Sequence, residues 1–206
     1  QDTGAAAAVT IRPAEPTKWD AAIYATWLGE RWPDSSFDSN RWYGVASGGA
    51  QVGYHLTSHL KVELDVATSS QGQIYSFEVI PVPGSLTPLY LQRKHDFRVT
   101  TASAGLEYQF FENAWFHPLV GTGLEFLRER QHIETAFQTF SPRDPRATAM
   151  PPQPETLVRY AARPFIAGGF KAYVSDHTFI RSDLRVPWSP DGVAGLAWRS
   201  GVGVDF

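Results

Sequence analysis

Ser175, Asp176 and His177 place a hydroxyl, a carboxylate and an imidazole in three consecutive residues, the side-chain types that nucleophilic hydrolysis uses. They lie in a short polar segment between two expected strands, where serine and aspartate commonly form turns. We therefore expect a turn here and not a catalytic site. His55 and His59 are four residues apart, but on a strand and a turn, not on a helix, so they are not spaced as a ligand pair. The sequence predicts no catalytic residue, no metal site and no cofactor.

Arg181, Asp183 and Arg185 recur at every second residue and alternate with the apolar Ile180 and Leu184. This spacing puts the three charges on one face of a strand. Such a row of charges could bind an anion. We favour ion pairing inside a barrel, because other expected strands carry acidic residues on the corresponding face.

The longest alternation lies at the end of the chain, in residues 193–206. One face carries Leu196, Trp198, Val202, Val204 and Phe206, and the other carries glycine, arginine and aspartate. A strand with lipid on one side and a polar lumen on the other has this pattern over about ten residues. The pattern predicts a transmembrane β-barrel.

Similar alternation predicts eight strands in all, an even number. Their expected ranges are 20–32, 41–56, 59–77, 94–110, 115–130, 157–174, 178–187 and 193–206. The facing of the first strand is ambiguous, because Tyr24 and Trp27 fall on opposite faces. The expected fold is an all-β, eight-stranded, antiparallel up-and-down barrel spanning residues 19–206, preceded by a flexible arm at residues 1–18.

The expected connections alternate between tight turns and longer segments, as in barrels with short periplasmic turns and longer outer loops. The two longest, residues 78–93 and 137–156, are rich in proline and are expected to be loops. Loops on a rigid scaffold often carry function, so both are candidates for binding a protein partner.

The polar faces of the expected strands carry charges of both signs. An eight-stranded barrel is just wide enough for side chains to fill, and buried charges must be paired. We therefore expect a mostly plugged lumen with an ion-pair network made of Lys61, Glu63, Asp65, Glu107, Glu125, Arg163, Lys171, Arg181, Asp183, Arg185, Arg199 and Asp205.

Composition narrows the class of protein. The chain has 206 residues, no cysteine and a net charge of -3, which gives no reason to expect nucleic acid as a partner. A membrane helix would need about 20 apolar residues in a row, and no such run exists. If the chain spans a membrane, it must therefore do so with β-strands. The start of the chain is compatible with a secreted protein whose signal peptide has been removed.

The segments HPLVGTGLEF (117–126), RPFIAGGFKAYVSDHTFIRSDLR (163–185) and GVGVDF (201–206) resemble the small outer-membrane β-barrel proteins of the OmpA/OmpX-like family. The resemblance implies a location in the bacterial outer membrane, contact with outer-membrane lipid, and recognition of Phe206 by the barrel-assembly machinery. We expect no peptidoglycan-binding domain after the barrel, which departs from full-length OmpA-type proteins and puts cell-wall anchoring in doubt.

The expected function is a non-enzymatic outer-membrane barrel with a structural or loop-mediated role in the cell envelope. A lipid-modifying barrel enzyme, a narrow channel and a soluble β-barrel that binds a small ligand remain as alternatives.

Overall fold

The computed structural model describes residues 17–31, 42–81, 89–110, 115–141, 144–149 and 153–206. Its strands alternate between core-facing and outward side chains, as the sequence pattern requires. They are β1 (Trp19–Arg31), β2 (Trp42–His55), β3 (Leu60–Ser69), β4 (Gly72–Ile80), β5 (Leu89–Gln109), β6 (Phe116–Ser141), β7 (Asp144–Ala149), β8 (Gln153–Tyr173), β9 (Thr178–Ser189), β10 (Gly192–Val193) and β11 (Gly195–Asp205). Among the described residues, no helix is long and apolar enough to cross a membrane.

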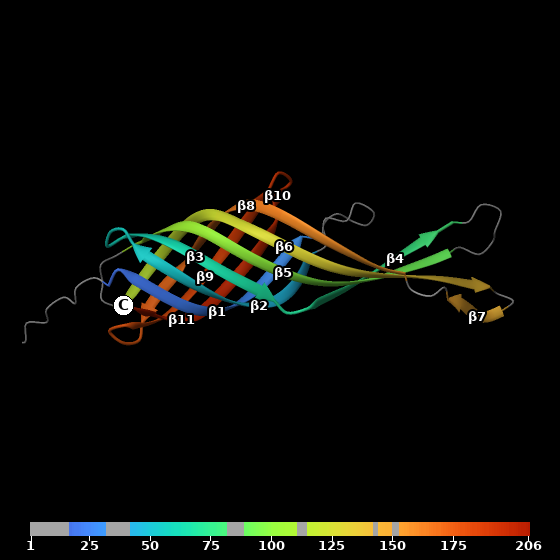
Figure 1. The fold of residues 1–206 in the computed structure, drawn as a ribbon, viewed down its shortest axis with the longest axis horizontal. Helices are drawn as coiled ribbons and strands as arrows, with labels where there is room; N and C mark the ends of the chain where they lie inside the picture. The colour runs from blue at the N-terminus through green and yellow to red at the C-terminus, as the bar shows by residue number, and fades with distance from the viewer. Residues whose placement is uncertain (1–16, 32–41, 82–88, 111–114, 142–143, 150–152) are drawn as a thin grey trace, which may run out of the picture.

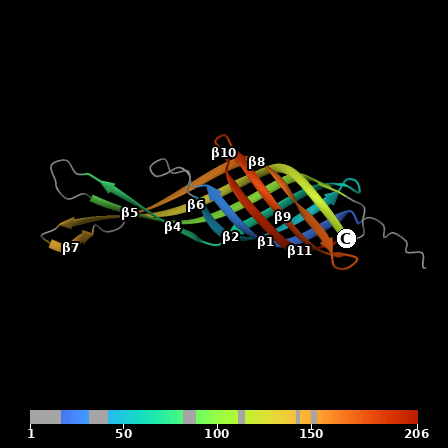
Figure 2. The ribbon, with the colours of Figure 1, turned by 180° about the vertical axis from the view of Figure 1, so that it is seen from behind.

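Eight of these strands close into a ring, in the order β1, β2, β3, β5, β6, β8, β9 and β11. The ring closes where β11 pairs with β1, for example at Val202 opposite Ile23. Neighbours in the ring are antiparallel and follow one another along the chain (Figures 1 and 2). The predicted eight-stranded up-and-down barrel is therefore confirmed.

The structure resolves the facing of the first strand. Tyr24 points into the lumen, where its hydroxyl donates to Asp65 at 3.0 Å. Trp27 points outward and is 59% exposed. The two aromatic residues can therefore lie on opposite faces. The Tyr24 hydroxyl has a hydrogen-bond partner inside the barrel, and the Trp27 ring adds to the apolar outer surface.

Where the structure describes the two predicted loops, they are largely strands, so the loop prediction is wrong there; residues 82–88, 142–143 and 150–152 lie outside the described residues. Strand β4 continues to Ile80 and β5 already begins at Leu89, whereas β6 runs to Ser141 and β7 and β8 occupy most of the second segment. Proline here marks strand ends and edges and does not exclude strands. Pro81 directly follows β4, and Pro145 lies in β7, which pairs only with β6 in the described sheet.

These additional strand segments pair with one another and form a sheet that projects from one end of the barrel (Figure 1). We call it the ribbon; it consists of β4, residues 89–97 of β5, residues 131–141 of β6, β7, and residues 153–157 of β8. The predicted strand 59–77 enters it but is interrupted between β3 and β4. At this interruption the Ser69 hydroxyl accepts the backbone N–H of Val99 at 2.9 Å.

The opposite end of the barrel carries short turns and the end of the chain. In the turn between β2 and β3, the Thr57 hydroxyl accepts the N–H groups of His59 and Leu60 at 3.2 and 3.0 Å. Phe206 and Trp19 exchange two backbone hydrogen bonds there, of 3.0 and 2.9 Å. The predicted arm at residues 1–18 falls mostly outside the described residues.

Candidate functional site: the charged lumen

The inward residues of the ring form a charged interior. All twelve residues predicted for the lumen are buried, with at most 8% of their surface exposed. Six are basic and six are acidic, so the predicted set is neutral as a whole. They come from β3, β5, β6, β8, β9 and β11, and the barrel brings them together across separations of more than 100 residues.

Two lysines organise the end of the lumen near the short turns. Lys61 lies 3.0 Å from Asp20 and 3.1 Å from Glu107. Lys171 lies 3.3 Å from Asp20 and 2.8 Å from Asp205. The two lysines therefore share one carboxylate, and each also has a carboxylate of its own, which is the pairing that buried charges require.

Arg181 holds the first part of the central cluster. Its guanidinium forms an ion pair with Glu63, lies 2.7 Å from Glu107 and lies 2.8 Å from Asp183. Glu107 also contacts Lys61, so the lysine and arginine clusters are continuous. A planar guanidinium has enough donors to serve three carboxylates at once.

Arg185 and Arg199 complete the central cluster from β9 and β11. Arg199 lies 2.8 Å from Asp183 and 3.4 Å from Asp65, and Arg185 lies 2.8 Å from Asp65. The Ser103 hydroxyl accepts from Arg185 at 2.7 Å and donates to Asp65. The central charges are thus held by hydrogen bonds as well as by ion pairs.

Arg163 forms a third cluster farther toward the ribbon. It lies 2.5 Å from Glu30 and 2.8 Å from Glu125. Near this level the interior also contains an apolar group that the sequence analysis did not identify, consisting of Leu28, Val45, Phe97, Val99, Leu127 and Ala197. Aromatic rings line the lumen beside the cations as well: Lys171 lies 3.9 Å from the centre of the Phe179 ring, and Arg185 lies 3.9 Å from that of Phe165.

Small cavities lie between these side chains. Three cavities among the lumen residues measure about 30, 10 and 10 Å³. A cavity of this size holds about one water molecule. The three cavities adjoin one another, because Arg199 lines all of them.

Two carboxylates of the ion-pair network were missed by the sequence analysis, Asp20 and Glu30. Both lie in β1, whose facing was left ambiguous, and both are buried inside. The signal was present, because Asp20, Tyr24 and Glu30 share the even-numbered face of β1. It was obscured because the same face also carries Ala22, Tyr24 and Leu28, so neither face of β1 is clearly the polar one.

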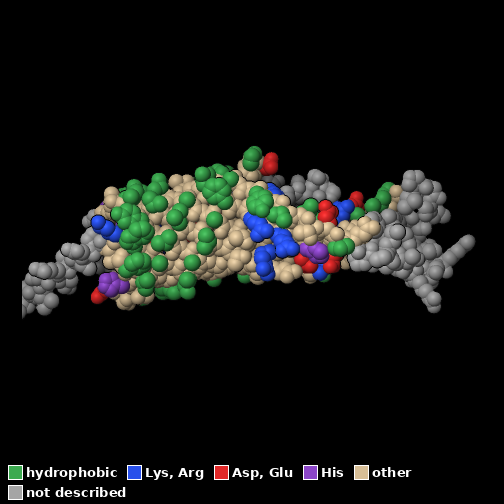
Figure 3. Space-filling view, viewed as in Figure 1, with side chains coloured by type: hydrophobic (Ala, Val, Ile, Leu, Met, Phe, Trp, Pro, Cys, Tyr) green, Lys and Arg blue, Asp and Glu red, His purple; other side chains and the backbone are tan. Residues whose placement is uncertain are grey.

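The outward face is apolar along the barrel (Figure 3). Its exposed residues include Ile23, Leu64, Leu106, Leu124, Ile166 and Leu184. Aromatic residues gather near the end with the short turns, where Trp19 packs on Tyr54 and Trp115 on Phe116, with ring centres 4.8 and 5.5 Å apart. This is the arrangement that a barrel surrounded by lipid requires.

The candidate hydrolytic residues form a turn. The Ser175 hydroxyl accepts the backbone N–H of Thr178 at 3.1 Å, and Asp176 and His177 are exposed beside it. Among the described residues, no group of three or more histidine, aspartate or glutamate side chains could hold a metal ion. Phe206 is exposed at the same end of the barrel, and its role as an assembly signal stays a prediction.

Comparisons with known proteins agree with this geometry. No protein-family model and no curated protein sequence matches the chain. Among solved structures, Neisserial surface protein A is 14% identical with a TM-score of 0.56, covering 91% of this chain and 97% of that one. The outer-membrane protein OprG of Pseudomonas aeruginosa is 12% identical with a TM-score of 0.54, covering 93% and 97%.

The attachment invasion locus protein Ail of Yersinia pestis is also similar, at 12% identity and a TM-score of 0.53, covering 93% of this chain and 100% of that one. At these identities the likeness concerns the fold. The resemblance to OmpA/OmpX-like barrels is confirmed at that level. The chain has the fold of the small eight-stranded outer-membrane β-barrel proteins.

Proposed function

We propose that this protein is a non-enzymatic integral outer-membrane barrel that is closed to ions and that carries the ribbon outside the cell. The observation that supports it most strongly is the inversion of the usual distribution of side chains. The charges are buried and paired within the ring, and the large apolar residues are exposed around it. A protein in water gains nothing from this distribution, whereas a protein in lipid requires it.

Closure of the lumen rests on the ion-pair network. Lys61, Arg181 and Arg163 each contact carboxylates from at least two different strands, so the network crosses the barrel repeatedly. An ion that moved through would have to displace paired charges in a low-dielectric interior, which is costly. The small cavities described above are consistent with this reading.

The ribbon is the part best placed to meet a partner. Strand β4 lies at its edge, and Tyr75, Phe77 and Val79 point to one face of it with more than 40% of their surfaces exposed. Exposed apolar residues on a projecting strand are typical of interaction surfaces. A protein partner bound through residues 78–93 or 137–156 remains part of this proposal, and the described residues of these segments lie mostly on strands.

Planar-bilayer recording tests closure. Refolded protein, shown to be folded by its heat-dependent shift on a detergent gel, is added to a bilayer. We expect no conductance step above the baseline. The double substitution Arg185→Ser and Arg199→Ser removes two of the three central guanidiniums and should admit ions. Discrete steps from the unsubstituted protein would contradict closure.

Labelling of intact cells tests the orientation. The chain has no cysteine, so single cysteines can be introduced cleanly. Tyr75→Cys in the ribbon should react with a membrane-impermeant maleimide on intact cells, whereas Asp176→Cys in a short turn should react only after permeabilisation. The reverse pattern would place the ribbon in the periplasm.

A further inference from the structure

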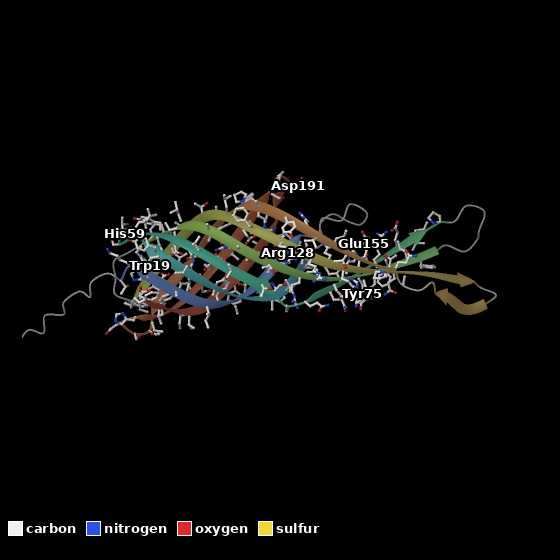
Figure 4. All side chains as sticks on the ribbon, viewed as in Figure 1. Trp19, His59, Tyr75, Arg128, Glu155 and Asp191 are labelled. Carbon is white, nitrogen blue, oxygen red and sulfur yellow. The ribbon has the colours of Figure 1, made fainter. Side chains whose placement is uncertain are left out.

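Three arginines lie together on the outer face of the barrel, at its junction with the ribbon. Arg98 in β5 is directly opposite Arg130 in β6, and Arg128 lies two residues from Arg130 on the same face. All three are exposed. Figure 3 shows a basic patch where the barrel meets the ribbon, and Figure 4 labels Arg128 at this place in the same view.

The arginines border the apolar surface directly. The next cross-strand row toward the middle of the barrel consists of Ala102, Phe126 and Ala162. Tyr160, opposite Arg128, is 73% exposed, and Val158 lies opposite Arg130. The arginines therefore lie where the apolar belt ends, at the depth expected for lipid headgroups in the leaflet on the ribbon side.

These charges have no acidic counterpart in the described part of the chain. Glu129 lies between Arg128 and Arg130 in sequence, but it points into the barrel and is buried. Asp96, one row farther along the ribbon, pairs instead with Lys94 and Gln73, each at 2.8 Å. Like charges directly opposite each other on neighbouring strands are destabilising. An external anion would relieve the repulsion between Arg98 and Arg130.

We propose that Arg98, Arg128 and Arg130 bind the phosphate groups of lipid A in the outer leaflet. Guanidinium groups bind phosphate in bidentate geometry, and a cluster of three can serve two phosphates on one headgroup. The acyl chains of the same molecule lie against Phe126 and the neighbouring belt. This inference rests on the proposed placement in the outer membrane with the ribbon outward.

The surroundings favour a lipid over a soluble polyanion. The cluster is small, and exposed apolar residues adjoin it at Phe126, Val158 and Tyr160. A soluble polyanion would make no use of these residues, whereas an amphiphile contacts both parts. The site therefore differs from the buried network, whose arginines are all engaged with carboxylates.

The experiment uses the full chain in phosphatidylcholine nanodiscs doped with diphosphoryl lipid A or with the same lipid after removal of its phosphates. Lipid retained by the protein is measured by native mass spectrometry. The test variant is Arg98→Gln, Arg128→Gln and Arg130→Gln combined. The charge-matched control combines Arg93→Gln, Lys94→Gln and Arg159→Gln, which removes three other exposed or half-exposed cations near the ribbon.

We expect the unsubstituted protein and the control to retain diphosphoryl lipid A roughly tenfold better than the test variant, because charge-assisted bidentate contacts are lost only there. Retention should also fall when the phosphates are removed. The site would be overturned if the test variant retained diphosphoryl lipid A as well as the unsubstituted protein does, or if the dephosphorylated lipid were retained equally well. In either case the heat-dependent gel shift must show that the barrel has inserted. Equal binding of a soluble sulfated polysaccharide in detergent would overturn the choice of lipid. Failure to insert at all would overturn the proposed function itself.

Discussion

The ammonium group of Lys61 lies 3.0 Å from the carboxylate of Asp20, and both residues are fully buried. Lys61 also lies 3.2 Å from Glu63 and 3.1 Å from Glu107. One cation thus neutralises carboxylates from three strands of the ring. The pairing joins β1, the strand whose facing was ambiguous, to the rest of the network.

Replacing Lys61 with methionine should strongly destabilise the barrel. The substitution leaves Asp20, Glu63 and Glu107 with one fewer cation in a buried environment, and breaking such a pair costs about 3–5 kcal/mol. Urea-induced unfolding in lipid vesicles, followed by tryptophan fluorescence, measures the change. Lys94→Met in the exposed ribbon serves as the control and should change the free energy of unfolding far less. Equal effects of the two substitutions would contradict the structural role of the buried cluster.

A second prediction concerns Gly123, where close packing in the lumen leaves no room for a side chain. A Cβ atom there would lie 2.7 Å from the Cα of Gly105 and 2.8 Å from the Phe165 ring. Gly123→Ala should therefore lower the free energy of unfolding by about 1–3 kcal/mol, as overpacking does. Gly168→Ala is the matched control, because its Cβ would have its nearest neighbour at 4.0 Å. A neutral Gly123→Ala would show that the lumen is looser than described.

The ribbon should show a local response to pH. The hydrogen bonds from Lys94 and then Gln73 lower the pKa of Asp96, and the same contact raises the pKa of Lys94. A carboxyl group whose pKa is lower in the folded than in the unfolded state stabilises the folded state at pH values above the ordinary carboxyl pKa. This contribution disappears as the pH falls through the pKa of the folded state. NMR titration of the Asp96 carboxyl should give a midpoint below that of an unstructured aspartate. Lys94→Met should move the midpoint upward, and an unmoved midpoint would rule out the contact.

The turn at Ser175–His177 should not affect lipid chemistry. Ser175→Ala removes the hydroxyl that accepts the Thr178 N–H, so a small loss of stability is expected. The lipid composition of membranes containing Ser175→Ala or His177→Ala should match that of membranes with the unsubstituted protein, as seen by mass spectrometry. A change in acylation that depends on either residue would support the lipid-modifying enzyme instead.

Period-two alternation was sufficient to predict the ring and most of its lumen. Residues such as Lys61, Arg181 and Arg199 alternate with mostly apolar positions, so their inward direction follows from the strand period. Strand β1 lacks that uniformity, because Ile23 and Trp27 are outward while Tyr24 and Leu28 are inward. Hydrophobicity alone could not choose between its two faces.

Much of the ribbon was missed for a different reason, although the predicted strands 59–77 and 94–110 include parts of β4 and β5. Beyond the membrane belt both faces of a sheet meet water, so polar and apolar residues no longer have to alternate. Residues 78–93 therefore lack the signal that identified the barrel strands, and prolines at 81, 83 and 88 suggested a loop. Backbone pairing with β5 and β6 defines the ribbon, and such long-range pairing leaves little trace in local sequence.

Placement of the apolar belt in lipid is tested most directly by the accessibility of spin labels. Single cysteines replace Leu64, Leu124 and Leu184 on the outer face and Tyr75 in the ribbon, and each carries a nitroxide in the protein reconstituted in vesicles. We predict that the three belt labels collide more often with oxygen, which concentrates in lipid, than with a water-soluble nickel complex, and that the label at position 75 shows the reverse. Belt labels that favour the nickel complex in verified, folded samples would contradict a membrane-spanning barrel and support a soluble one.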